Sequence, residues 1–155
     1  MGLMQAGRID EAEMQLDECG QHATGHPNYE ATFALLRAVQ GNGTSAIEHA
    51  ERALGSAGAT YLDQVIAYLA AAGGHATQGH HDQAVLTIEA AIAKAMFVGD
   101  VVTIALSAAA YERLTGTKHA ASDGCAELSS GWTTVINQLF RPEQLNERQA
   151  AVAGE

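Results

Sequence analysis

A repeated turn, in which a glycine is followed five residues later by an alanine, most constrains how this chain can fold. The turn occurs four times, and its glycines are separated by 34, 38 and 37 residues. The four pairs are Gly7 and Ala12, Gly41 and Ala46, Gly79 and Ala84, and Gly116 and Ala121. A period of this length accommodates two helices and two turns. The glycine can end one helix in the left-handed conformation, and the small alanine allows two helices to approach closely.

The composition also favours helices over strands. Aromatic residues make up only 5% of the chain, so the core must consist mainly of Ala, Leu, Ile and Val, which suits helix packing better than sheets. A length of 155 residues and an apolar fraction of 47% are typical of one globular domain. We therefore expect a single all-α domain over residues 1–140, followed by a polar, flexible tail over residues 141–155.

Apolar spacing and helix-stop residues predict where the helices lie. Pro27 sets a boundary ahead of one helix, and Thr60 with Asp63 resembles a capping box at the start of another. Asp10, Thr44 and Asp82 suit the cap or first turn of the helices that follow the glycines. The expected helices cover residues 10–20, 29–40, 44–54, 60–78, 82–98 and 100–114.

Beyond Gly116 the pattern is looser. We expect an eighth helix that is interrupted at Asp123 and Gly124, because a glycine inside a helix costs about 1 kcal/mol relative to alanine. A short apolar segment, residues 132–140, follows and is expected to pack back on the last helix pair.

The charge balance excludes several classes of partner. The formal net charge is −10, and without a basic cluster such a chain is repelled by nucleic acid and by anionic membranes. The longest apolar stretch, Val65–Gly74, is far shorter than a membrane span, and no basic leader precedes an apolar run. Cys19 and Cys125 are too few and too far apart for a disulfide framework, so we expect buried, reduced thiols in a cytoplasmic protein.

The helix pairs, the turn glycine and the alanine after it resemble the tetratricopeptide repeat, over residues 1–131. Further matches to that family are small or apolar residues at two packing positions of each unit. They are Ala34, Ala72 and Ala109 seven residues before a turn glycine, and Cys19, Ala53, Ala91 and Leu128 seven residues after a turn alanine. The resemblance implies a right-handed α-solenoid of about three and a half helix pairs. Departures are the absence of the family's usual proline and the residues at the position of the expected large aromatic, which are Glu30, Tyr68 and Ala105, of which only Tyr68 is aromatic.

A second resemblance suggests an alternative function. Residues 60–116, together with Gly131 and Trp132, resemble the helical-repeat carboxy-terminal parts of large actinobacterial ATP-binding signalling proteins, namely the cyclase-linked and LuxR-type regulators. The chain has no Gly-x-x-x-x-Gly-Lys-Ser/Thr motif for nucleotide phosphates. This resemblance implies a sensory or regulatory carboxy-terminal fragment of a multi-domain ATPase, cyclase or transcriptional regulator.

The amino-terminal end carries apolar residues that lack an expected partner. Only residues 1–6 precede the first turn glycine, too few for the first helix of a pair, so the helix at 10–20 would be uncovered on one side. The apolar residues concerned are Leu3, Met4, Ile9, Met14 and Leu16. Because a solenoid needs a polar cap at each end, we expect a second copy of the chain, forming a homodimer, or another protein to cover them.

Equivalent positions in successive units predict a polar stripe along the first helix of each pair. In a stacked array this stripe would face a shared groove where a peptide or a partner helix could bind, which predicts a non-catalytic protein-binding scaffold. The alternative is that the stripe is the solvent side of each helix. The candidate binding residues are Glu30, Arg37, Gln40, Tyr68, His75, Gln78 and Glu112.

The residues that could carry metal or catalytic chemistry are better explained by their places in the repeat. His75 and His80 lie across an expected helix end, and no histidine pair has metal-ligand spacing on one helix face. Gly-x-Ser-x-Gly is missing, and the two cysteines occupy a packing position or a degenerate helix. We therefore expect no metal, no cofactor and no enzymatic activity; turnover that is lost on replacing His75 would restore the enzymatic alternative.

Overall fold

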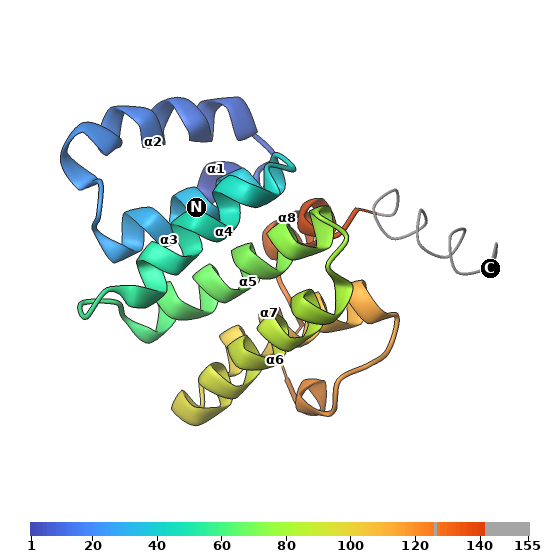
Figure 1. The fold of residues 1–155 in the computed structure, drawn as a ribbon. Coiled ribbons are helices and arrows are strands. Elements are labelled where there is room, and N and C mark those ends of the chain that lie inside the picture. Colours follow the sequence, from blue (N-terminus) through green and yellow to red (C-terminus); the bar gives the residue numbers. More distant parts are fainter. Residues whose placement is uncertain (126, 142–155) are drawn as a thin grey trace.

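The structure, a computed structural model, describes residues 1–125 and 127–141. This part of the chain contains helices and no strand, which confirms the all-α expectation (Figure 1). The helices are α1 (Gly2–Gln5), α2 (Ile9–Ala23), α3 (Pro27–Val39), α4 (Gly43–Gly55), α5 (Tyr61–Thr77), α6 (His81–Val98), α7 (Val101–Thr115), the 3-10 turn η1 (Ala120–Ser122) and α8 (Ser130–Leu139). The tail expected at 141–155 lies outside the described residues from 142 onward.

The repeated turns have the conformation that their glycines predict. Each of the four turn glycines has a positive φ, between +71° and +80°, where a side chain would be strained. The alanines of the first three turns are buried. The helices that follow these turns begin two residues after the glycine, so Asp10, Thr44 and Asp82 lie in the first turn, and Asn42 caps α4 by accepting a hydrogen bond from the Ser45 amide at 3.2 Å.

The other expected boundaries fall within three residues of the observed ones. Pro27 is the first residue of α3, where its missing N–H costs nothing. Thr60 and Asp63 form the expected capping box at the start of α5, with both reciprocal hydrogen bonds present. The local residue pattern was therefore sufficient to place the long helices.

At the amino-terminal end, residues 2–5 form only the single turn α1. One expectation about the other end of the repeat was wrong. No eighth helix with an interruption exists between α7 and α8 in the described residues, where only η1 is helical. Local contacts hold this segment in another shape: the His119 ring packs edge-on against Tyr111 at 4.9 Å, Lys118 binds Asp123 at 2.7 Å, and Gly124 has a φ of +83°.

The long helices pack in chain order. Contacts join α3 to α4, α4 to α5, α5 to α6 and α6 to α7, and α3 also packs along α5. The interior consists mainly of small and aliphatic side chains, as the composition predicts. Its largest fully buried members are Phe140 and Met4, and the next largest include Leu35, Leu36, Ile66, Leu69, Ile88 and Leu106.

Helix α8 departs furthest from the expected arrangement. It was expected to pack on the last helix pair, and it does contact α7, but it also contacts α1 and α3. Its buried side chains are Val135, Ile136 and Leu139, followed by Phe140. Arg141 then donates a hydrogen bond to the carbonyl oxygen of Val39 at 2.6 Å. The chain thus returns from its carboxy-terminal part to its amino-terminal part.

Candidate functional site

The part of the polar stripe on α3 is used in contacts with α2. The guanidinium of Arg37 donates to the carboxylate of Glu13 at 2.6 Å and to the side-chain oxygen of Gln40 at 2.8 Å. The amide of Gln40 donates to the other oxygen of Glu13 at 2.8 Å. The Arg37 guanidinium also lies 4.5 Å from the centre of the Phe33 ring, a favourable cation–π contact. Arg37 and Gln40 therefore attach α2 to α3.

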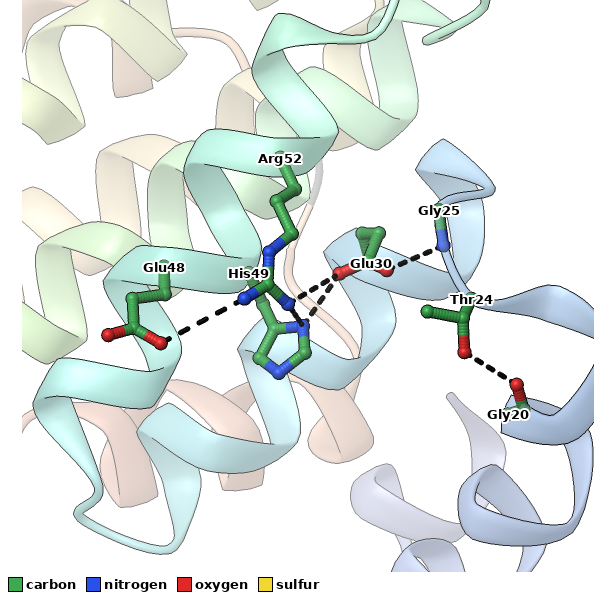
Figure 2. A network of polar contacts seen from close by, with 7 residues as sticks. All are labelled: Gly20, Thr24, Gly25, Glu30, Glu48, His49 and Arg52. Carbon is green, nitrogen blue, oxygen red and sulfur yellow. Dashed lines mark hydrogen bonds and ion pairs between the residues drawn. The ribbon is translucent and has the colours of Figure 1, made fainter.

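Glu30 lies at the centre of a second polar network, which joins α3 to α4 (Figure 2). Its side chain is only 1% exposed. One carboxylate oxygen accepts a hydrogen bond from the Gly25 amide at 2.7 Å, and the other lies 2.6 Å from Nδ1 of His49 and 3.7 Å from the Arg52 guanidinium. The network thus fixes the loop between α2 and α3 against α4.

The charge of Glu30 is stabilised by these partners in spite of its burial. Burial by itself raises the pKa of a carboxyl group. The hydrogen bonds from His49 and Gly25, with the positive charge of Arg52, outweigh burial and hold the pKa of Glu30 below its usual value. Glu30 is therefore an ionised structural residue at neutral pH.

The stripe residues of α5 lie near α4. Gln78 donates to the Thr44 hydroxyl at 3.0 Å. His75 is half-buried, and its Nδ1 is buried without a hydrogen-bond partner within the described part of the chain. Burial and the nearby His80 lower the pKa of His75, and Glu51 opposes this in part. Glu51 and His75 each lie 38 residues after Glu13 and Arg37, so the two pairs occupy equivalent positions of successive units.

The seven candidate residues consequently do not form one open groove. Tyr68 is partly buried against the core, and Glu112 is exposed on α7. Arg37 and Gln40 are brought together, whereas Glu30 faces α4 in a separate network. The solvent-side interpretation fits Gln78 and Glu112 but not Glu30. A role of these residues in binding a partner stays a prediction.

Helix α8 packs on part of the surface formed by α3, α5 and α7, in addition to its contact with α1. A Cβ atom on Gly73 of α5 would lie 3.0 Å from Leu139 and 3.3 Å from Ala38 of α3, so Leu139 packs where these two helices meet. Helix α8 also contacts α7. Figure 1 shows α8 beside α5, although it is distant in sequence. Gly73, a glycine within a helical pattern, was the sequence signal for this close approach and was not used.

The amino-terminal end is better covered than the sequence predicts. Met4 is fully buried, and Leu3, Ile9 and Leu16 pack partly against the core, because α8 contacts α1. Met14 remains 64% exposed. A cleft of about 520 Å³ remains between α1 and α2; its lining residues include Met1, Leu3, Met4, Leu16 and Cys19.

The expectation that both cysteines are buried was wrong. Both are free, but Cys19 is exposed and Cys125 is half-buried, donating from its sulfur to the carbonyl oxygen of Ala121 at 3.2 Å. The equivalent packing residues Ala53 and Ala91 are buried as expected. Cys19 instead lines the cleft between α1 and α2.

An exposed apolar surface, absent from the sequence predictions, lies where α6 meets α7. Phe97 is 90% exposed. Tyr61 connects this surface to the start of α5, because its hydroxyl donates to Asp100 at 2.8 Å. We define the α6–α7 corner by the exposed residues Tyr61, Leu62, Met96, Phe97, Val98, Val101 and Val102.

Neither metal-binding nor membrane-spanning features occur in the described residues. Over residues 1–125 and 127–141, no group of three or more His, Cys, Asp or Glu side chains is placed to hold a metal ion. No helix in that same part is both long and apolar enough to cross a bilayer. Comparison of the chain with protein-family models, with curated proteins and with solved structures gave no match.

Proposed function

We propose that this chain is a non-catalytic scaffold that binds a short amphipathic helix of a protein partner on the surface formed by α3, α5 and α7. In this proposal the helix pairs stack as a right-handed, tetratricopeptide-like solenoid, whose inner side is formed by the first helix of each pair. Helix-in-groove binding of this kind uses apolar side chains at helical spacing.

The observation that supports the proposal is the packing of α8. Its buried residues Val135, Ile136 and Leu139 have the spacing of one helix face, and Leu139 packs over Gly73 and Ala38. A helix of this length is not stable alone in water, so α8 depends on the surface that it covers. This surface is therefore already bound by a helix, α8, whose apolar side chains have the spacing that we propose for the partner helix.

The connection between α7 and α8 makes this occupant resemble a tethered ligand. Residues 116–129 separate the two helices. A tether of such length gives an effective local concentration in the millimolar range. A partner helix must therefore outcompete α8 or bind when the contacts of α8 are weakened.

The test uses a fluorescent peptide with the sequence of residues 129–141. Its binding is measured by anisotropy against the full chain and against the full-length Leu139→Asp variant, in which the internal α8 is weakened. We expect at least about tenfold tighter binding to the variant, because the competitor is weaker. Circular dichroism checks that the variant is folded, and Leu139→Ala is the milder replacement.

A matched peptide with Leu139→Asp is the control and should bind neither protein. Equal binding of the original peptide to both proteins, or binding to neither, contradicts the proposal. The alternative of a regulatory fragment of a larger signalling protein rests on the resemblance alone and is favoured by no contact in the structure.

A further inference from the structure

The α6–α7 corner exposes a group of large apolar side chains. Phe97 is 90% exposed, and Met96, Val101 and Val102 are each more than half exposed. With Val98, Tyr61 and Leu62, side chains of this size present on the order of 700 Å² of surface to solvent. The largest apolar patch of a typical monomer is about 300–600 Å², and larger patches mark interaction sites.

The corner is also poor in charge, although the chain as a whole is acidic. The formal net charge is −10, so two copies repel one another over most of their surfaces. Between residues 90 and 102 the only charged residues are Lys94 and Asp100. This region is therefore one on which two copies could meet with little repulsion.

Two opposite charges flank the most exposed residue of the corner in the sequence. Lys94 precedes Phe97 by three residues, and Asp100 follows it by three. Asp100 accepts hydrogen bonds from the Tyr61 hydroxyl at 2.8 Å and the Val102 amide at 3.0 Å, which favour its charged form. A two-fold pairing that brings Lys94 of each copy toward Asp100 of the other therefore matches opposite charges, as a self-complementary interface requires.

We propose that the α6–α7 corner is a two-fold interface between two copies of this chain, with Phe97 at its centre. The exposed surface estimated for the corner is of the same order as the roughly 800 Å² per partner that a standard stable interface buries. This dimer differs from the one expected at the amino-terminal end, where α8 already buries Met4. Figure 1 shows α2 and the α6–α7 turn at opposite ends of the molecule.

The first test measures the mass of the full chain in solution by light scattering and sedimentation. We expect about twice the 16.2 kDa of one chain at concentrations near 100 µM. The variant Phe97→Asp should be a folded monomer, because this side chain is 90% exposed and its replacement disturbs no core. The matched control is Met14→Asp, which changes an exposed apolar residue of α2 and should leave the dimer intact.

A second test asks directly whether the two copies of Phe97 lie close together in the dimer. In a Cys19→Ser, Cys125→Ser background, Phe97→Cys should form a disulfide-linked dimer under mild oxidation, since two-fold contact brings the two sulfurs together. Met14→Cys in the same background should not. In addition, Lys94→Glu should weaken the dimer about tenfold by placing like charges together, while Lys94→Arg should preserve it.

A chain that stays monomeric at about 200 µM overturns the proposal, as does a dimer that survives Phe97→Asp. A dimer lost on Met14→Asp but not on Phe97→Asp assigns the contact to the amino-terminal end and also overturns it. None of these measurements depends on the surface under α8, so the result is independent of the peptide-binding function.

Discussion

Gly43 of α4 and Gly74 of α5 lie so close that a Cβ atom on Gly43 would be 2.6 Å from the carbonyl oxygen of Gly74. A Cβ on Gly74 would in turn lie 2.8 Å from the carbonyl oxygen of Gly43 and 2.9 Å from Ile47. Both neighbours include backbone atoms, which cannot rotate away. The two helices are therefore held at a separation that only glycine permits.

Replacing Gly74 with alanine should consequently destabilise the protein. We expect the free energy of unfolding to fall by about 1–3 kcal/mol, the usual cost of overpacking, as measured by urea denaturation. Gly55→Ala is the control, because no atom lies within 4 Å of its added Cβ, and it should be neutral or stabilising by up to about 1 kcal/mol. Equal effects of both changes would contradict the close approach.

Glu30→Gln should lower stability at neutral pH by about 1–3 kcal/mol, because a charged acceptor of buried hydrogen bonds is lost. The folded state holds the pKa of Glu30 below its usual value. This carboxylate therefore contributes stability that is present above about pH 4.3 and is lost as the pH falls through the folded-state pKa.

The measurement for Glu30 is urea denaturation at a series of pH values from 7 to 3. The variant should lack part of the acid-induced loss of stability seen in the parent chain. Glu48→Gln, on the exposed side of α4 near Arg52, is the control and should change stability by less than about 0.5 kcal/mol. Identical pH profiles for parent and Glu30→Gln would exclude the proposed role of the network.

His75 should make the stability of the protein depend on pH in a higher pH range than Glu30 does. Its pKa is lowered by burial and by His80, so the folded state disfavours its protonation. The contribution of neutral His75 to the free energy of unfolding is fully present above about pH 6.5. It is lost as the pH falls from there toward the pKa of His75 in the folded state. His75→Gln should flatten the profile between pH 7.5 and 5, whereas His22→Gln, at an exposed position, should not. A pH profile of stability that is unchanged by His75→Gln would contradict this role of His75.

Arg37→Ala should loosen α2 without unfolding the remaining helices. The pair with Glu13 is partly buried and is accompanied by Gln40 and the Phe33 ring, so its loss should cost about 1 kcal/mol or somewhat more. Hydrogen exchange should become faster in α2 and stay unchanged in α5. Arg8→Ala is the control, because Arg8 binds Glu11 within the same segment and does not join α2 to α3. Faster exchange throughout the protein would contradict a local tether.

The sequence predicted the long helices well because their signals are local. A turn glycine, a capping box and a proline each act within a few residues, and all were found where expected. The segment from residue 117 to 129 was not predicted, since its shape depends on contacts such as that of His119 with Tyr111. Helix propensity alone does not contain this information.

The candidate site was harder to predict because it depends on which helix each face meets. Glu30, Arg37 and His75 were predicted from their equivalent positions in successive units, but the sequence could not show that the first two are used in contacts with α4 and α2. Two signals were present and were not used. Gly73 and Gly74 within a helical pattern indicate close approach, and the run from Met96 to Val102 contains one charge, Asp100.

The return of α8 to α1 affects how the molecule melts. In a linear array each repeat touches only its neighbours, so the terminal units can unfold while the middle persists. Here Gly131 lies against Gln5, with a Cβ on the glycine only 2.9 Å from that side chain, so the first and last helices of the described residues support one another. Fraying of either helix thus removes support from the other, so we expect a single cooperative unfolding transition. We also expect the contact between α1 and α8 to form slowly during folding, because it joins segments far apart in sequence.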